Sequence, residues 1–242
     1  VLAVNGEIYN HHELRVEIAT PEVFRTDSDC EVILPLYARE GPRLLQRLRG
    51  MFAFALYDAA KDDWLIARDP IGIIPLYVGR RKDGSLAVAS ELKALATCCD
   101  SVRELPPGHY QTSRDEKPVR YYSRDWFDYD AVPDREVDPG EIREALADAV
   151  HSHLMTDVPY GVLLSGGLDS SVIGAVAAKY AGKRVESGDS EAAWWPRLHS
   201  FAIGLAGSPD LVAAKRAAEG IGTVHHGFEF TVQEGLDALH DV

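Results

Sequence analysis

Cysteine is scarce in this sequence: Cys30, Cys98 and Cys99 are the only ones among 242 residues, and two of them are adjacent. Three thiols do not make the even set that a disulfide-stabilised domain uses, and the C-x-x-C spacing typical of zinc sites is absent. The sequence therefore favours a reducing, cytoplasmic setting and offers no set of metal ligands from the protein.

Long hydrophobic runs and an excess of positive charge are also missing. The longest apolar run, VPYGVLLSGG, is far shorter than the roughly 18 residues that a membrane span needs. The opening residues, VLAVNGEIYN, lack the basic and hydrophobic regions of a secretory signal. With 38 acidic and 25 basic residues the net charge is −13, which argues against nucleic acid and anionic membranes as partners.

The first half of the sequence is predicted to consist mostly of short strands. Apolar runs separated by turn residues are LAVNG, MFAFALYD, DWLIARD, IPLYVGR and SLAVAS. In residues 51–57 both alternating sets are apolar, which indicates a strand buried on two faces. Helices are expected at 12–19, at 42–48 and from Ser28, where Ser28 and Glu31 have the spacing of a capping box. Antiparallel sheets with helices outside satisfy this pattern.

A change of pattern divides the chain. Residues 119–137 are rich in Tyr, Asp and Arg without periodicity, and their aromatic residues require a surface to pack on. After them, Asp138 and Pro139 begin a helix, and strands then alternate with helices, which implies a parallel sheet. We expect one domain at residues 1–118, a connection at 119–137 and a second domain at 138–242.

The strongest local motif is the glycine-rich turn Ser165–Ser171, which links the strand GVLL to a helix. Adjacent glycines allow the backbone to approach a ligand closely, and the amides at the start of the helix favour a phosphate group. The turn also lies at the carboxyl end of a parallel strand, where open α/β sheets bind ligands. The alternative interpretation is a purely structural turn with Ser and Asp capping. Asn5-Gly6 and Asp29 likewise have ordinary interpretations, as a turn pair and as a first-turn acid.

Longer stretches resemble a known family. The segments SGGLDSS, SFAIGLAGSPDL and GTVHH are similar to the synthetase domain of glutamine-dependent asparagine synthetases, which is an N-type ATP pyrophosphatase. The segments NGEIYN, TDSDCEVI, GMFAFALYD, ARDPIGIIPLY and ASELKAL resemble the class II glutamine amidotransferase domain that precedes it. The resemblance implies an α+β amidotransferase of the Ntn type, followed by an α/β parallel-sheet ATP pyrophosphatase domain.

The resemblance also assigns roles to individual residues. It implies that Asn5 and Gly6 supply the donors of an oxyanion hole, and that these two with Glu7 and Asp29 bind the substrate glutamine. The residues implied to bind ATP are Leu163, Ser165, Gly166, Gly167, Asp169, Ser170 and Ile203, of which Leu163 and Ile203 contact the adenosine.

The family's reaction is the conversion of aspartate to asparagine through a β-aspartyl-adenylate. Ammonia comes from glutamine hydrolysis, ATP and Mg²⁺ activate the carboxylate, and AMP and pyrophosphate are released. The resemblance thus implies small-molecule partners and allows a homodimer. Two alternatives stay open: an ATP-dependent cyclase similar to β-lactam synthetase, and a non-catalytic nucleotide-binding remnant.

One departure from the family pattern concerns the nucleophile. The family uses a cysteine at its mature N-terminus, whereas Val1 begins this sequence, and Cys30, Cys98 and Cys99 are interpreted as buried or incidental thiols. We therefore expect a fragment truncated at both ends, with both domains incomplete and no glutaminase activity of its own.

Overall fold

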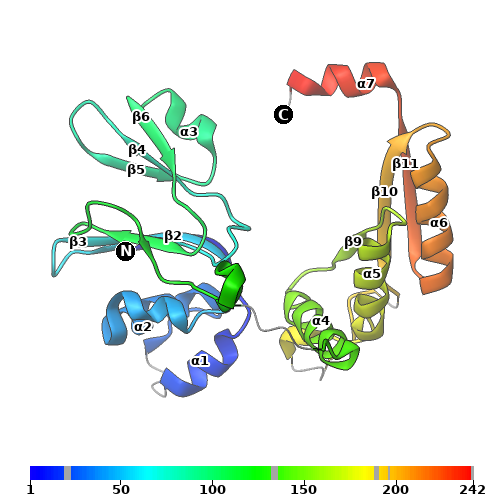
Figure 1. The fold of residues 1–242 in the computed structure, drawn as a ribbon, viewed down its shortest axis with the longest axis horizontal. Helices are drawn as coiled ribbons and strands as arrows, with labels where there is room; N and C mark the ends of the chain where they lie inside the picture. The colour runs from blue at the N-terminus through cyan, green and yellow to red at the C-terminus, as the bar shows by residue number, and fades with distance from the viewer. Residues whose placement is uncertain (19–22, 132–135, 188–190, 196, 241–242) are drawn as a thin grey trace. The chain divides into compact units, whose positions relative to one another are not determined.

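A computed structural model describes residues 1–18, 23–131, 136–187, 191–195 and 197–240. The chain divides into two compact units, Val1–Arg135 and Glu136–Val242 (Figure 1). No sheet and no core cluster of the described residues is shared between the two units.

The first unit is built around a five-stranded antiparallel sheet. Its strands are β1 (Leu2–Ile8), β2 (Gly50–Asp58), β3 (Asp63–Arg68), β7 (His109–Thr112) and β8 (Val119–Arg120), in the order β1-β2-β3-β7-β8. In the β1–β2 register Asn5 lies opposite Ala53 and Gly6 opposite Phe52. The sheet therefore places the Asn5-Gly6 pair inside a paired strand, not in a turn.

Layers cover both faces of this sheet. One face packs against α1 (His11–Ile18), α2 (Ile33–Glu40) and the 3₁₀ turns Asp29–Val32 and Gly41–Gln46. The other face packs against a second antiparallel sheet of β5 (Leu86–Ala89), β4 (Tyr77–Arg80) and β6 (Ser101–Glu104), which carries α3 (Leu92–Ala96). Figure 1 shows this order of layers. Phe52 and Phe54 of β2 belong to the first core and Ala53 to the second, so the prediction of a strand buried on two faces is confirmed.

The capping box predicted at Ser28 and Glu31 is wrong. Ser28 makes no side-chain cap, and a 3₁₀ turn at Asp29–Val32 precedes α2. The Glu31 carboxylate instead accepts hydrogen bonds from the backbone amides of Arg25 and Thr26, each at 2.8 Å. The carboxylate thus closes the preceding loop rather than the helix start. The helix predicted at 42–48 is the 3₁₀ turn Gly41–Gln46, and residue 19 of the first predicted helix lies outside the described residues.

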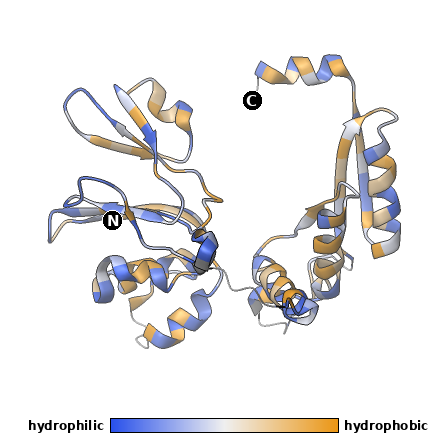
Figure 2. Ribbon diagram, viewed as in Figure 1, coloured by the Kyte–Doolittle hydropathy of each residue, from blue (hydrophilic) through white to orange (hydrophobic). Residues whose placement is uncertain are grey.

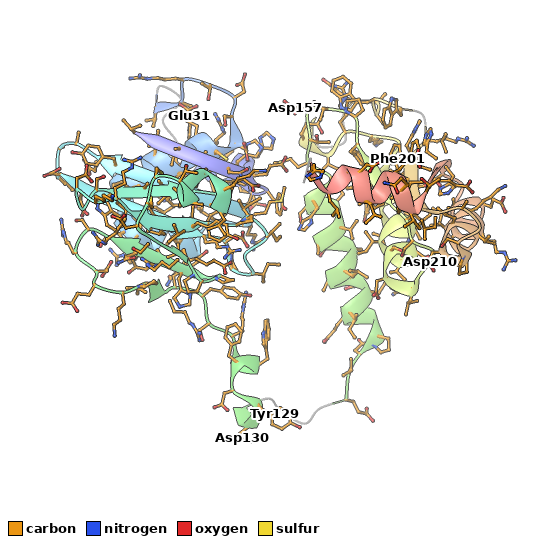
Figure 3. The ribbon with its side chains drawn as sticks, turned by 90° about the horizontal axis from the view of Figure 1, so that it is seen from above. Glu31, Tyr129, Asp130, Asp157, Phe201 and Asp210 are labelled. Atoms are coloured by element: carbon orange, nitrogen blue, oxygen red, sulfur yellow. The ribbon has the colours of Figure 1, made fainter. Side chains whose placement is uncertain are left out.

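The first residues of the expected connection belong to the first unit. Val119–Arg120 form β8, and the Tyr121 hydroxyl donates a 2.8 Å hydrogen bond to the backbone oxygen of Arg68. Two 3₁₀ turns follow, Asp125–Phe127 and Tyr129–Ala131, and Tyr129 and Asp130 lie on this outgoing segment (Figure 3).

The second unit contains a three-stranded parallel sheet, as its strand–helix alternation predicts. The elements in chain order are α4 (Pro139–His153), β9 (Gly161–Leu163), α5 (Leu168–Tyr180), a 3₁₀ turn (Val185–Ser187), β10 (His199–Leu205), α6 (Pro209–Ile221), β11 (Val224–Phe230), α7 (Val232–Asp237) and a final 3₁₀ turn (Ala238–His240). The strand order is β11-β10-β9, with both pairs parallel. The Asp138 carboxylate accepts from the Gly140 amide at 2.7 Å, which confirms the predicted cap of α4.

The two faces of the parallel sheet differ. The helices α5 and α6 pack on one face, where Leu211 lies against Gly204 and Leu164 against Gly174. Polar and apolar residues are interleaved along α4 and α6, as Figure 2 shows. On the opposite face the side chains of Leu163, Ile203 and Phe228 are 84%, 71% and 52% exposed. This face therefore presents an apolar surface beside the glycine-rich turn. No helix among the described residues has the length and hydropathy required to cross a membrane.

Two candidate half-sites

The glycine-rich turn between β9 and α5 depends on Gly166 for its packing. Gly166 has a φ of +79°, and a Cβ at this position would lie 2.4 Å from the backbone carbon of Ala213 and 2.5 Å from the amide nitrogen of Ala214. The turn therefore rests directly on the backbone of α6, and only glycine fits. Gly167 differs, because a Cβ there would meet only the Ser165 hydroxyl, at an ordinary contact distance of 3.6 Å.

Two serine hydroxyls organise the exposed side of the turn. The Oγ atoms of Ser165 and Ser170 lie 2.8 Å apart, so one donates to the other. The Ser165 amide donates to Ser170 Oγ at 3.3 Å and the Gly167 amide to Ser165 Oγ at 3.4 Å, both near the upper limit for a hydrogen bond. These long contacts at exposed positions leave the amides on the open side of the turn, where a stronger acceptor such as a phosphate oxygen competes well.

An open pocket of about 550 Å³ lies at this edge of the sheet. Among the ATP-binding residues implied by the sequence, Leu163, Ser165, Ser170 and Ile203 line it, whereas Gly166, Gly167 and Asp169 lie on the adjoining turn. The other residues that line the pocket are Leu164, Phe201, Ala202, Asp210, Leu211 and Phe228. Figure 3 shows Phe201 and Asp210 in this unit.

Sequence reasoning missed the aromatic part of this pocket. Phe201 and Phe228 lie on β10 and β11, and the register places Ile203 directly opposite Phe228 and Leu163 opposite Phe201. Alternation along HSFAIGL would have assigned Phe201 and Ile203 to one face. The pairing of Phe228 with that face depends on the register between strands, which the sequence does not reveal.

In the first unit, β1 passes very close to β2 at Gly6. Gly6 has a φ of +135°, and a Cβ there would lie 2.0 Å from the backbone oxygen of Met51. The neighbouring Asn5 directs its side-chain amide to the Ser90 hydroxyl, with 3.0 Å between Nδ2 and Oγ. Asn5 thus presents its amide from a fixed, exposed position, next to a residue that is required to be glycine.

The two carboxylates implied for glutamine binding lie near each other. Asp29 accepts a 2.6 Å hydrogen bond from the amide of Ile8, two residues beyond Gly6. Burial, then the charge and hydrogen bond of Asp29, then the charge of Glu7, raise the pKa of the Cys30 thiol to about 12. The charges of both carboxylates therefore act on the same thiol beside β1. An anionic pair of this kind favours an ammonium group.

Cys30 itself is not a nucleophile. Its side chain is buried, and its Sγ donates weakly to the backbone oxygen of Gly6 at 3.5 Å. A thiol with a pKa near 12 is almost wholly protonated at neutral pH, and reactivity requires the thiolate. The interpretation of Cys30 as a buried thiol is confirmed, whereas Cys98 is exposed and Cys99 half-buried.

Arg68 and Asp69 form a scaffold that sequence reasoning did not identify. Asp69 is fully buried, and its carboxylate accepts hydrogen bonds from the amides of residues 71–74 and, at 3.3 Å, from that of Phe52. The Arg68 guanidinium donates to the backbone oxygens of Gly72, Ile74 and Leu105. The pair holds the loop after β3 against β2 next to Gly6. In the sequence, only the segment ARDPIGIIPLY points to this scaffold.

Within the described part of the chain, no three His, Cys, Asp or Glu side chains are grouped so as to hold a metal ion.

Two family models match the chain, one in each unit. Residues 1–106 match the family model described as a glutamine amidotransferase domain, and residues 141–242 match that described as asparagine synthase. Asparagine synthetase B [glutamine-hydrolyzing] of Escherichia coli is 61% identical over 242 residues, covering 100% of this chain and 44% of the relative. Over its whole length the chain is thus similar to glutamine-hydrolysing asparagine synthetases. The probable asparagine synthetase of Schizosaccharomyces pombe is 51% identical over 249 residues, covering 100% of this chain and 45% of the relative.

The two domain matches support the predicted fold class. The antiparallel layers agree with an Ntn-type amidotransferase domain, and the parallel sheet agrees with the beginning of the synthase domain. The chain spans less than half the length of the curated relatives it matches. Among solved structures, glutamine phosphoribosylpyrophosphate amidotransferase from B. subtilis is similar at 22% sequence identity and a TM-score of 0.44. The alignment covers 95% of this chain and 45% of that one.

Proposed function

We propose that the whole protein is a ligase that makes asparagine from aspartate, with ATP as energy source and glutamine as ammonia donor. The observation that carries this proposal is the exposed turn at Ser165–Ser170 beside an apolar pocket. The same chain has Asn5, Gly6 and Glu7 on β1, with Asp29 bonded to that strand through the Ile8 amide. The first arrangement suits a nucleotide, and the second suits an α-amino acid with a carboxamide.

In the glutamine half-site the proposed roles follow from the chemistry of each group. The Asn5 side-chain amide and the Gly6 backbone amide would donate to the oxygen of the carboxamide as it becomes an oxyanion, and such donors contribute a few kcal/mol each. Glu7 and Asp29 would hold the α-ammonium group. The attacking thiol is the family's N-terminal cysteine and is not among the three cysteines of this chain.

In the nucleotide half-site the residues present fit ATP. Amides of the turn and the hydroxyls of Ser165 and Ser170 are the donors that a polyphosphate requires, and Leu163 and Ile203 offer an apolar surface for the adenosine. Bound ATP would supply an adenylyl group that turns an inert carboxylate into an acyl electrophile. The turn would hold the pyrophosphate part while Gly166, Gly167 and Asp169 shape its position. Mg²⁺, which prefers oxygen ligands and keeps its water, would be held mainly by the phosphates.

The organisation and setting of the protein are proposed on similar grounds. We assign the amidotransferase role to residues 1–118 and the ATP-dependent role to residues 138–242. Residues 119–137 are the connection, and its first two residues form β8 of the first sheet. Free thiols at Cys30, Cys98 and Cys99 support a reducing cytoplasm. A homodimer remains a prediction that light scattering on the full-length protein tests.

A cyclase similar to β-lactam synthetase is the second candidate, because it would share the nucleotide half-site. The carboxylates Glu7 and Asp29 distinguish the two, since glutamine has an α-ammonium to bind there. Equilibrium titration of the chain with glutamine tests this. Weak but saturable binding of glutamine, with none for N-acetylglutamine, supports the asparagine-forming function, and equal binding of both contradicts it.

Ile203→Ala is expected to weaken ATP binding about tenfold, which corresponds to roughly 1.4 kcal/mol of lost apolar contact. Because Ile203 is 71% exposed, the free energy of unfolding should hardly change. Leu205→Ala, on the same face of β10 but outside the pocket lining, is the matched control and should bind ATP as the parent chain does. Titration calorimetry measures both, and equal losses in the two variants would remove the adenosine role from Ile203.

Asp29→Asn is expected to reduce glutamine affinity at least tenfold while the first unit stays folded. The asparagine side-chain oxygen still accepts from the Ile8 amide, but the charge that attracts an ammonium group is lost. Asp27→Asn, two residues earlier and without an assigned role, is the control. Retention of full glutamine affinity by Asp29→Asn in the same titration would contradict the carboxylate's role.

A further inference from the structure

The adjacent cysteines Cys98 and Cys99 form a cluster that neither half-site uses. Their Sγ atoms lie 3.7 Å apart, immediately after α3. Cys98 is exposed, and its Sγ lies 3.5 Å from the backbone oxygen of Ala94. The Cys99 sulfur lies over β4, where only the absence of a side chain at Gly79 makes room for it, since a Cβ there would be 2.5 Å away. These contacts hold the two sulfur atoms next to each other, just after α3.

This pair faces an open pocket of about 440 Å³. The pocket is lined by Arg81, Lys82, Asp83, Thr97, Cys98, Cys99 and Asp100. The sulfurs are therefore accessible to a reagent from solvent, in contrast to the buried Cys30. Burial, followed by the neighbouring Cys98 thiol, raises the pKa of Cys99.

The spacing suits chelation better than a disulfide. A trans peptide bond joins the two residues, which fixes their Cα atoms at about 3.8 Å, below the roughly 4.4–6.8 Å that disulfides use. Two sulfurs bonded at about 2.3 Å to one atom, either a tetrahedral metal ion or a pyramidal trivalent arsenic, lie roughly 3.4–3.8 Å apart, close to the observed separation. A single atom can therefore bond to both sulfurs with almost no movement of the backbone.

We propose that Cys98 and Cys99 form a bidentate dithiol site for thiophilic centres that need only two ligands from the protein, with trivalent organoarsenicals as the best-matched class. The described part of the chain groups no three residues as metal ligands, so a centre that brings its own remaining substituents fits better than one that requires a full protein cage. Soft metal ions that take their remaining ligands from solvent are the second class of centre that the same two sulfurs would bind.

The reaction with an arsenoxide balances without an oxidant. The arsenic–oxygen double bond breaks, two arsenic–sulfur bonds form, and the two thiol protons leave with the oxygen as one water molecule. Arsenic stays trivalent and keeps its organic group. Chelation by two sulfurs on one chain makes the second bond intramolecular, which slows dissociation greatly compared with a single thiolate.

The test uses phenylarsine oxide on the 242-residue chain, with intact mass and thiol counting as readouts. The parent chain and Cys30→Ser should each gain one phenylarsenic group and lose two titratable thiols, and a small dithiol should reverse this whereas a monothiol should not. Cys98→Ser, Cys99→Ser and Cys98→Ala should release arsenic to a monothiol about a hundredfold faster. Equal release rates from the parent chain and these variants would overturn the proposal.

A second arm replaces the arsenical with Cd²⁺ and records the ultraviolet thiolate-to-metal charge-transfer absorption. Absorption in the parent chain that disappears in both single serine variants extends the site to soft metal ions. Arsenical chelation without this absorption restricts the site to arsenicals. Absorption that survives in both variants, together with unchanged arsenic release, shows that the pair is not a site.

Discussion

Gly6→Ala is expected to destabilise the first unit by about 3–5 kcal/mol, a large part of the roughly 5–15 kcal/mol that stabilises a typical domain. The new Cβ would lie 2.0 Å from the Met51 oxygen and 2.7 Å from the Cα of Phe52, so β1 has to move away from β2. The φ of +135° adds a backbone penalty of about 1–3 kcal/mol for any residue other than glycine. Urea unfolding followed by circular dichroism measures the loss as a lower midpoint.

Gly84→Ala is the matched control for that measurement. Gly84 also has a positive φ, +81°, but no atom within 4 Å would meet its Cβ. Its expected cost is therefore the backbone penalty alone, about 1–2 kcal/mol. A Gly6→Ala variant no less stable than Gly84→Ala would show that the close approach of β1 to β2 is not a constraint on this strand.

Gly167→Asp is expected to weaken ATP binding by about 2–3 kcal/mol, roughly 30–150-fold, without destabilising the second unit. Gly167 is the N-cap of α5 with a φ of −74° and a ψ of 171°, a conformation that aspartate adopts readily and in which it caps helices well. The added carboxylate would compete for the amides of the turn and repel the phosphates. Affinity should therefore fall while the unfolding midpoint is maintained or rises.

Gly167→Asn separates charge from shape in this experiment. Asparagine has the same size and caps helices equally well, but it carries no charge. We expect its ATP affinity to lie much closer to that of the parent chain. If the two variants bind ATP equally, charge at the turn does not matter and a phosphate does not bind there. Gly166→Val does not serve as a test, because it would collide with the backbone of Ala213 and disrupt the packing of α6.

Local patterns predicted much of the fold. Two-sided apolar alternation identified β2, and the strand–helix alternation after Asp138 predicted the parallel sheet, because each depends only on neighbours in sequence. Predictions failed where a distant group competes with a local one. The Ser28–Glu31 spacing fits a capping box, yet the Glu31 carboxylate binds the amides of Arg25 and Thr26 in the loop before it.

The candidate sites show the same division. The sequence indicated the turn at Gly166 and Gly167. It did not reveal that position 166 must be glycine because the turn rests on the backbone of α6. Phe201 and Phe228 were missed because their shared face arises from the register between β10 and β11. Asp29 lies against β1 through the Ile8 amide, a contact between segments 21 residues apart. Contacts of this kind are set by tertiary packing, which composition and periodicity do not contain.

The central claim is that the backbone amides around Gly166 and Gly167 receive the phosphates of a nucleotide. Nitrogen-15 NMR of the labelled chain tests it most directly, by following the amide signals of residues 163–170 and of Ile203 during titration with ATP and Mg²⁺. We predict large downfield shifts of the Gly166 and Gly167 amide protons that saturate together with changes at Ile203. Saturation of ATP binding with these signals unmoved, or with shifts confined to other parts of the chain, would contradict the account.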